Sequence, residues 1–554
     1  MPLKVEGEGA DAEKYEMERL KLASENTVTF LPELSLKHKL DIMLGYSVSS
    51  DESANTKAKA EGLIMDKMKW DDLNAIQSKS NYTISSDRYC VTRQSMFARV
   101  NYNFLSKYYL TVTARADGSS NFAANRKWAF FPSMALKYNI KNEAFFKRQF
   151  WLDNLSLRAS IGRTGNDAIS SYKSAQYYSS NSSGYIFNGE QQLMFAPAQL
   201  ENPNLTWETT DSYNVALEAA FLKNRINTTI EYYGSRTTDL LLQVDVPRQT
   251  GYSSRFTNLG ETTNQGVEFT LETVNVEKKM FGWTSSLTIS HNTQMVRDIG
   301  HNNYVPVLKC PGNQKFMMYG YKEGYPLNSL WGFEYGGVVK NAEEFTENLE
   351  TKKYVYGSNL NKDTAPGYPR YIDQNNDGVL NNDDLVYLGN ADPIIYGGFQ
   401  NNFTVGPVKF RVYFTYSLGG KIYNFSELFM GGSASTNQYR YMLDGWHATR
   451  NPDSDIPKAG TAQNMLPASC YVHDASYLRL QNLMVSYTLD VRKWTKVFRY
   501  ATLSLNAHNV FLWTKYNGFD PDVSTNSGDS ALRRVAINDY PKARQFTATL
   551  QITF

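Results

Sequence analysis

The chain ends on FTATLQITF, Phe546 to Phe554, in which apolar and polar residues alternate throughout. Because successive side chains of an extended strand point to opposite faces, Phe546, Ala548, Leu550, Ile552 and Phe554 share one face, and only Thr and Gln occupy the other. Such an apolar face needs an apolar cover. In a transmembrane β-barrel lipid supplies that cover, and the strands alternate in this way over about 10 residues. The stretch therefore predicts a lipid-facing barrel strand.

The composition of the 554 residues agrees with a barrel. The chain is 42% hydrophobic and 20% charged, and its mean hydropathy is -0.48. A spanning barrel has such a low average because half of each strand faces a wet lumen and the loops are polar. Aromatic residues make up 14% of the chain and include 38 Tyr, which favours the aromatic girdles of a barrel. No apolar run approaches the roughly 18 residues that a membrane helix needs.

Charge and cysteine usage exclude several other classes. The net charge of +2 is spread evenly, with no basic stripe, so nucleic acid is not an expected partner. Cys90, Cys310 and Cys470 lie far apart and form no CxxC pair. They predict neither a disulfide framework nor a zinc site, and we expect them to be unpaired.

Strand-like alternation recurs along the chain in neighbouring pairs, which predicts antiparallel hairpins. We count roughly fifteen strand candidates by the period-two pattern. The predicted fold class is all-β, an antiparallel transmembrane β-barrel. The clearest pairs are residues 98–104 with 110–117, 213–221 with 226–232, 266–274 with 283–290, 400–404 with 410–417, and 483–489 with 501–507.

The connections between these strands alternate in length. Residues 223–225 form a short connection, whereas a long one runs over residues 297–392. Tight turns on one side and large loops on the other are typical of outer-membrane barrels. A β-propeller would instead repeat at about 40–50 residues, and the sequence has no such period.

At the level of whole motifs, the chain resembles the C-terminal part of the SusC/RagA family of TonB-linked outer-membrane transporters of Bacteroidetes-type bacteria. The similar blocks follow one another in the family's order, and the terminal strand is the last of them. The other blocks are residues 101–122, 130–146, 157–167, 202–226, 265–272, 324–338, 474–483 and 509–522.

The resemblance implies an energy-coupled importer in the outer membrane of a Gram-negative cell. Its substrates would be oligosaccharides or peptides, captured under a SusD-like surface lipoprotein and drawn in when TonB pulls on a plug domain. Such barrels have about 22 strands and a plugged lumen. No bond is broken in transport, so the protein is not expected to be an enzyme.

The resemblance also predicts a domain division. Residues 26–554 correspond to the C-terminal part of the barrel with its long extracellular loops, and the plug and the first several strands have no counterpart in the sequence. Since unpaired strand edges are costly in hydrocarbon, we expect a fragment, a truncated gene product or one part of a split barrel, which does not transport alone.

Residues 1–25 are expected to be a non-barrel or incomplete N-terminal segment. They are charged and weakly helical in character. They lack the apolar core of about 7–15 residues that a signal peptide shows. Because a barrel must be exported, either Met1 is not the natural start of the polypeptide or the barrel prediction is wrong.

One motif could bind a metal. Residues 373–384, DQNNDGVLNNDD, follow the calcium-loop pattern, with oxygen donors at the first, third and fifth positions and Gly at the sixth. Position 12 is Asp where a full EF-hand has the longer Glu, so affinity should be lower. A metal-free turn rich in Asn and Asp is the alternative. The predicted ligands of a structural Ca²⁺ are Asp373, Asn375, Asp377, Val379 (through its carbonyl), Asn381 and Asp384.

No other motif indicates chemistry. The six His are scattered, and no Ser lies in a GxSxG elbow. Tyr319, Tyr321, Tyr325 and Trp331 could stack on sugar rings or grip a lid, although packing within a loop is the more ordinary role of each. The alternative function is a secreted or surface all-β glycan-binding protein without transport activity, whose strand faces would be mixed rather than uniformly apolar.

Overall fold

The structure is a computed structural model of the chain. The residues it describes are 10–554 apart from 64–70, 75–81, 147–148, 182–185, 188–189, 192–193, 253, 301–303, 310–316, 341–365, 376–379, 432–436, 461–465, 493, 496, 524–531 and 538.

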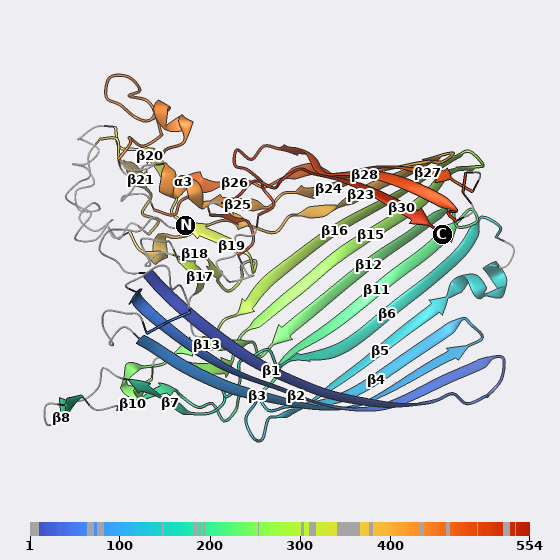
Figure 1. Ribbon diagram of the computed structural model, residues 1–554, viewed down its shortest axis with the longest axis horizontal. Coiled ribbons are helices and arrows are strands. Elements are labelled where there is room, and N and C mark those ends of the chain that lie inside the picture. The colour runs from blue at the N-terminus through green and yellow to red at the C-terminus, as the bar shows by residue number, and fades with distance from the viewer. Residues whose placement is uncertain are drawn as a thin grey trace. The chain divides into compact units, whose positions relative to one another are not determined.

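Fifteen strands form one large sheet in the described part of the chain, and neighbours in the sheet follow chain order (Figure 1). The pairs whose register is known are antiparallel, and β1 and β30 are the two ends of the sheet, which does not close on itself. The fold class predicted from the sequence is confirmed. The strands are β1 (Ala10–Phe30), β2 (His38–Leu63), β3 (Tyr82–Phe104), β4 (Tyr108–Ser119), β5 (Trp128–Asn139), β6 (Leu152–Asn166), β11 (Glu208–Phe221), β12 (Ile226–Thr238), β15 (Glu261–Lys278), β16 (Phe281–Asp298), β23 (Ile395–Val405), β24 (Val408–Leu418), β27 (Tyr477–Asp490), β28 (Tyr500–Thr514) and β30 (Gln545–Thr553).

The register gives the sheet one apolar and one polar face. In β28 and β30, Leu503 lies opposite Leu550, while the neighbouring pair is Thr502 and Gln551. The same separation continues into β27, where Val485 lies opposite Leu505. Side chains directly opposite each other on one face of a sheet are in contact. The alternation seen in each strand therefore adds up to continuous faces, which we call the apolar face and the polar face.

The predicted hairpins are confirmed, and one boundary is wrong. β3 with β4, β15 with β16, β23 with β24 and β27 with β28 all pair in antiparallel register. At the N-terminal side, however, the strand expected from residue 26 begins at Ala10, and residues 10–25 belong to β1. Charge obscured this strand in the sequence, since Arg19 is paired with Asp51 and Glu13 with Lys57 across the β1–β2 ladder.

The remaining elements lie in the long connections and are short. They form small sheets in the orders β10-β7, β13-β14, β17-β18-β19-β22, β20-β21, β26-β25-β29 and β8-β9. No helix among the described residues is long and apolar enough to cross a membrane. The elements are β7 (Tyr177–Asn181), β8 (Ile186–Phe187), β9 (Glu190–Gln191), β10 (Met194–Gln199), β13 (Leu241–Asp245), β14 (Ser254–Asn258), β17 (Val305–Lys309), β18 (Met317–Tyr321), β19 (Ser329–Gly332), β20 (Tyr335–Val338), β21 (Pro369–Tyr371), β22 (Val386–Asn390), β25 (Lys421–Asn424), β26 (Val472–Asp474), β29 (Val535–Ala536), the α-helix α3 (Phe425–Met430), and the 3-10 turns η3 (Ile140–Asn142), η4 (Ala144–Phe146), η5 (Arg248–Thr250), η6 (Asn382–Asp384), η7 (Arg440–Asp444) and η9 (Ser469–Tyr471).

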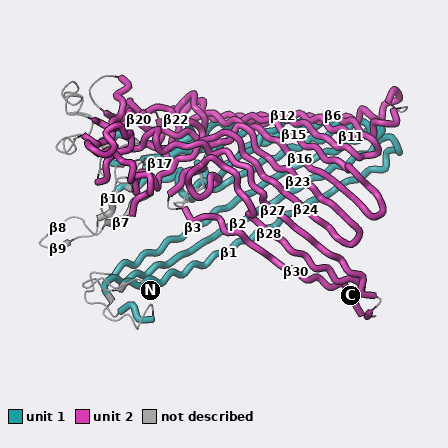
Figure 2. The backbone as a smooth tube through the Cα atoms, turned by 90° about the horizontal axis from the view of Figure 1, so that it is seen from above, with its two compact units in different colours: residues 1–137, 160–211, 237–259 teal, residues 138–159, 212–236, 260–554 magenta. Residues whose placement is uncertain are grey.

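The chain divides into two compact units, shown in different colours in Figure 2. Unit 1 comprises residues 1–137, 160–211 and 237–259, and unit 2 comprises residues 138–159, 212–236 and 260–554. Each has a buried apolar cluster of its own. In unit 1 Trp207 packs against Phe122 and Phe131. In unit 2 a larger cluster surrounds Trp331 and Phe333.

Candidate functional site: the polar face and the long connections

The polar face of unit 2 carries a cluster of charged side chains on three neighbouring strands. Arg158 on β6 lies 2.8 Å from Glu231 on β12 and 3.7 Å from Glu218 on β11. Ser156 donates to Glu218 over 3.0 Å, and Asn214 donates to Glu231. Two carboxylates share one guanidinium here. The cluster therefore adds negative charge to a polar surface.

Further along the polar face of unit 2, Tyr233 reaches across a glycine. Its hydroxyl donates to Asn292 Oδ1 over 3.0 Å and passes Gly266 on the way. A Cβ on Gly266 would lie 2.5 Å from the Tyr233 hydroxyl and 2.6 Å from the carbonyl oxygen of His291. The tyrosine thus occupies the space that the glycine leaves open, a way of covering glycine that is known from other sheets.

In unit 1 charged groups of the polar strand face gather near the long connections. Asp167 accepts hydrogen bonds from Arg93 over 2.6 Å and from the Ser119 hydroxyl over 2.8 Å. Asn121 is almost completely buried, and its amide donates to the carbonyls of Asp167 and Ile169. These contacts tie the connection after β4 to the connection after β6.

The long connection of residues 299–394 builds an apolar core within unit 2. Trp331 and Phe333 are almost completely buried, and the Trp331 indole donates to the Gly320 carbonyl over 3.1 Å. Tyr319 is fully buried, and its hydroxyl donates to Asn328 over 2.5 Å. Burial raises the pKa of Tyr319 above its ordinary value. This connection is therefore a folded element with a fixed interior.

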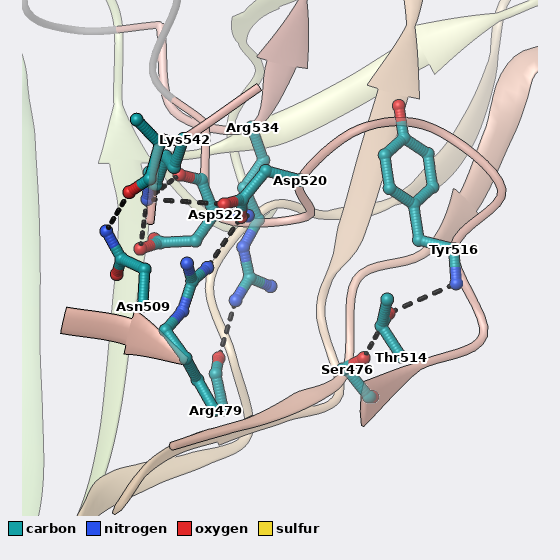
Figure 3. A network of polar contacts seen from close by, with 11 residues as sticks. Ser476, Arg479, Asn509, Thr514, Tyr516, Asp520, Asp522, Arg534 and Lys542 are labelled. Carbon is teal, nitrogen blue, oxygen red and sulfur yellow. Dashed lines mark hydrogen bonds and ion pairs between the residues drawn. The ribbon is translucent and has the colours of Figure 1, made fainter. Parts of the chain in front are cut away.

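The last connection, between β28 and β30, is fixed to the wall by buried charges (Figure 3). Arg479 on β27 donates to Asp520 over 2.7 Å, and the two side chains are 4% and 3% exposed. Arg534 donates to the Ser417 hydroxyl over 2.5 Å and to the Gly419 carbonyl over 3.1 Å. Burial lowers the pKa of Arg534, and the neighbouring Arg533 acts in the same direction.

Both anchor points lie on the polar face. Ser417 is opposite Tyr477, and Arg479 is opposite Thr415, while the apolar pair between them is Leu478 with Tyr416. The connection after β28 is thus attached to the polar side of the wall. Within the connection itself, Lys542 donates to the Asp522 carboxylate over 2.9 Å.

Comparison with known proteins assigns this architecture. Residues 26–510 match the family described as TonB dependent receptor-like, beta-barrel. The chain is 32% identical to TonB-dependent receptor P26 of Formosa agariphila over 99% of this chain and 54% of that protein. It is 28% identical to TonB-dependent receptor SusC of Bacteroides thetaiotaomicron over 84% of this chain and 44% of that protein. A solved structure, that of the RagAB peptide transporter, superposes with a TM-score of 0.80 at 26% identity, covering 98% of this chain and 56% of that one.

The chain belongs to the SusC/RagA family of TonB-dependent transporters. It spans about half the length of the curated relatives that it matches. The family is one of outer-membrane barrels, so the apolar face is the face toward lipid and the polar face is the lumen wall. In outer-membrane barrels the long connections are extracellular and the short turns face the periplasm. The relatives are transporters and receptors, which are not enzymes.

Of the aromatic residues considered in the SusC/RagA loops, two are not available to a ligand. Tyr319 and Trp331 are core residues of the long connection, which confirms the packing role for both. Tyr325 packs against Trp331 with ring centroids 4.9 Å apart. Sequence spacing could not show this, because the residues that cover these rings come from distant segments such as α3.

The predicted calcium loop lies only partly among the described residues. Asp377 and Val379 fall in the stretch 376–379, outside them. Asp384 is fully buried, and its carboxylate accepts the backbone N–H of Gln374 over 3.0 Å and of Asn381 over 2.8 Å. The Asn381 side chain accepts the N–H of Asp383 over 2.6 Å. Asn381 and Asp384 therefore form a capping box at η6.

This capping role neither requires nor rules out a metal at the loop. Burial raises the pKa of Asp384, against the opposing effect of the backbone hydrogen bonds to Asn381 and Gln374. No group of three or more His, Cys, Asp or Glu side chains placed to hold a metal occurs among the described residues. Asp373 and Asn375 precede the undescribed stretch. Calcium at this loop stays a prediction.

The cysteine prediction is confirmed where the structure describes it. Cys90 and Cys470 are free thiols, and Cys310 lies outside the described residues. Burial raises the pKa of the Cys470 thiol to about 12. Since the thiolate is the reactive form, Cys470 is an inert packing residue.

Proposed function

We propose that this chain supplies wall and extracellular loops to a TonB-dependent importer of oligosaccharides or peptides that works with a SusD-like lipoprotein. The observation that carries the proposal is the pair of continuous faces on one antiparallel sheet, apolar toward lipid and polar toward a lumen. The match of residues 26–510 to the receptor barrel family supports it.

The polar face supports passage of a polar solute. Among its charged groups, Arg158 is held by Glu231 and Glu218 on neighbouring strands. A wall with paired charges and many neutral hydroxyl and amide groups offers weak, exchangeable hydrogen bonds to sugar hydroxyls and peptide groups. RagAB, whose structure is similar to this chain, is a peptide transporter, and oligosaccharides fit the same wall chemistry.

The extracellular connections support a protein partner that covers the lumen. The folded core around Trp331 gives the loops a fixed surface, and η7 exposes Leu443 and Tyr441. Apolar side chains that stay exposed on an ordered loop favour contact with another protein. A SusD-like lipoprotein is the partner that the family assignment suggests.

The transporter is favoured over the secreted glycan-binding protein. A secreted protein would have to bury the apolar face, yet residues of that face such as Leu217, Leu505 and Leu550 are 42%, 54% and 64% exposed. Strand after strand repeats this exposure. Lipid is the cover that suits a face of this extent.

Uptake by intact cells tests the proposal. The gene would be deleted from its source cell and restored in trans, and accumulation of fluorescent oligosaccharides and peptides would be compared. We expect the deletion to abolish accumulation of one of the two classes, and a protonophore to abolish it in the complemented cells. Unchanged accumulation of both classes, together with recovery of the protein in the aqueous phase after detergent phase separation, would refute it.

A further inference from the structure

Two hairpins in the long connections of unit 1 are fixed to each other. β7 pairs with β10 in the connection after β6, and β13 pairs with β14 in the connection after β12. The side-chain amide of Asn202 donates to the Phe256 carbonyl on β14 over 2.8 Å. The side chain of Asn258 donates to the Thr206 carbonyl over 2.7 Å and accepts the Thr206 N–H over 2.8 Å. The two connections therefore form one ordered surface.

The turn that leads into β7 is held by a buried glutamine. Gln199 is 5% exposed. Its side-chain amide nitrogen lies 2.8–3.0 Å from three carbonyl oxygens of the turn, those of Tyr172, Lys173 and Ala175. The φ angle of Tyr172 is +64°, in the left-handed region that a tyrosine rarely adopts. Such a conformation persists only where the surrounding structure holds it, and it is frequent at ligand sites.

This ordered surface exposes several tyrosine rings. Tyr172, Tyr177 and Tyr178 are 53%, 44% and 56% exposed. The Gln176 amide donates to the Tyr178 hydroxyl over 3.0 Å and also to the hydroxyl of Tyr252, which lies in the turn between β13 and β14. One amide thus joins tyrosines from the two connections. We call Gln176, Tyr178 and Tyr252 the tyrosine patch.

The polar groups of the tyrosine patch are neutral and can bind a further molecule. In both bonds the Gln176 amide is the donor and the phenol oxygen is the acceptor, so the O–H hydrogens of Tyr178 and Tyr252 can donate elsewhere. The Lys173 ammonium, by contrast, lies 5.3 Å from the ring centroid of Phe256, where the ring face attracts it. The patch therefore combines aromatic ring faces with hydroxyl and amide groups.

These groups match a sugar more closely than a peptide. A pyranose ring has a face of C–H groups, which packs on an aromatic ring, and a rim of hydroxyls, which bond to amides and phenols. Tyrosine supplies such contact area at low cost in conformational entropy, because its side chain has few rotatable bonds. Peptide recognition commonly uses backbone pairing with a strand edge or charged side chains, whereas the side chains of the tyrosine patch carry no charge.

We infer that the tyrosine patch is a binding site for an oligosaccharide in the long connections of unit 1. Tyr178 and Tyr252 stack on sugar rings, and the Gln176 amide and the phenol hydroxyls bind sugar hydroxyls. The role of this site in uptake rests on the proposed function, since it selects oligosaccharides from the two substrate classes. The site would hold a sugar before the sugar passes along the polar face.

Saturation-transfer NMR tests the site on the purified protein with its complete barrel. The probes are hexasaccharides of glucose, mannose, galactose and xylose, together with an uncharged hexapeptide. We expect one or more of the hexasaccharides to bind and the hexapeptide to bind less well. Tyr178→Ala and Tyr252→Ala should each weaken sugar binding roughly twofold to tenfold, as expected for the loss of one aromatic contact. Tyr178→Phe keeps the ring and should weaken binding less.

Tyr540→Ala is the matched control, because Tyr540 is 89% exposed in unit 2, on the connection between β28 and β30, and sugar binding should not change. The site is overturned if no hexasaccharide binds, or if wild type, Tyr178→Ala and Tyr252→Ala bind equally. Tighter binding of the hexapeptide would also overturn it, as would variants that lose a copurifying lipoprotein and keep sugar binding. If the purified protein binds sugar at the patch while deletion of the gene leaves cellular accumulation unchanged, the site stands and the proposed function fails.

Discussion

Replacing Arg479 by Met tests whether the last connection is held to the lumen wall by one buried charge pair. The variant keeps the volume and removes the guanidinium that donates to Asp520 over 2.7 Å. Asp520 would remain 3% exposed, with only the Asp522 N–H at 2.9 Å and the Lys542 ammonium at 3.9 Å. A carboxylate left in this position has lost its main partner.

The expected cost follows from burial. Removing one partner of a buried ion pair typically destabilises by about 3–5 kcal/mol, and each 1.4 kcal/mol is roughly tenfold in an equilibrium constant. Opening of the connection should therefore become roughly a hundredfold to several thousandfold more frequent. The exposed pair of Arg492 and Asp490, with side chains 60% and 42% exposed, provides the control. Arg492→Met should change no protection measurably, because exposed pairs contribute little.

Amide hydrogen exchange measures this opening directly. The reporters are the N–H of Asp522, bonded to Asp520, and the N–H of Arg534, bonded to the Val523 carbonyl over 2.9 Å. Both should lose protection in Arg479→Met. The double variant Arg479→Met/Asp520→Leu should restore much of the protection of the Arg534 N–H, since an apolar pair replaces the charges, but not that of the Asp522 N–H, whose acceptor is lost. Equal protection in the wild type and Arg479→Met would show that the pair does not hold the connection.

The same connection should open in acid. Although burial acts to raise it, the Lys542 ammonium lowers the pKa of Asp522 below its ordinary value. A carboxyl with a lowered pKa stabilises the folded state above its unfolded pKa of about 3.9, and this contribution is lost as the pH falls through the lowered value. Exchange protection should thus be constant near neutral pH and decline only below about pH 4. Loss of protection between pH 7 and 5 would contradict the assignment.

Three further perturbations probe the wall and the calcium loop. Gly266→Ala places a Cβ against the His291 carbonyl and should lower the free energy of unfolding by about 1–3 kcal/mol. Gly282→Ala is the control, because the atom nearest to its Cβ would be 3.6 Å away and the free energy of unfolding should change little. Leu505→Arg on the apolar face should cost about 2–4 kcal/mol near the bilayer midplane, and its neighbour Ser504→Arg on the polar face much less. In calorimetric titration, Ca²⁺ should bind the wild-type protein and fail to bind the Asp373→Ala variant, which keeps the capping box of Asn381 and Asp384. Absence of binding heat with the wild type would refute the calcium prediction.

The wall of this barrel could be predicted from the sequence because its rule is local. The alternation within a single strand is enough to show which of its residues face lipid, and Phe546 to Phe554 is the clearest case. The rule failed at residues 10–25, where β1 carries charges on both sides. There the strand is specified by partners such as Asp51 for Arg19, which are distant in sequence. In this chain, alternation of apolar and polar residues identifies a strand where one face of the strand is apolar, and it fails where both faces carry charges.

The extracellular connections could not be predicted in the same way. Packing was the expected role of Tyr319 and Trp331, with ligand stacking as the other possibility, but their spacing did not say which residues cover them. Their burial depends on α3 and on residues near Leu466 and Val535, which no spacing rule connects with them. Asp384 fitted a calcium ligand, yet its described contacts cap η6. A short motif cannot tell a capping carboxylate from a metal ligand, since both place an acid where backbone donors converge.

The position of the anchors says where the last connection must lie. A guanidinium as deeply buried as that of Arg479 is tolerable only beside a carboxylate, and lipid would supply none. Because Arg479 and Ser417 both point to the polar face, the segments of the connection around Asp520 and Arg534 fold against the polar side of the sheet. The connection also exposes Phe519, which is 67% exposed. Under the proposed function, a solute that follows the polar face near β24 and β27 would pass a connection fixed by charge, so variants at Arg479 should change uptake by cells without altering the strands.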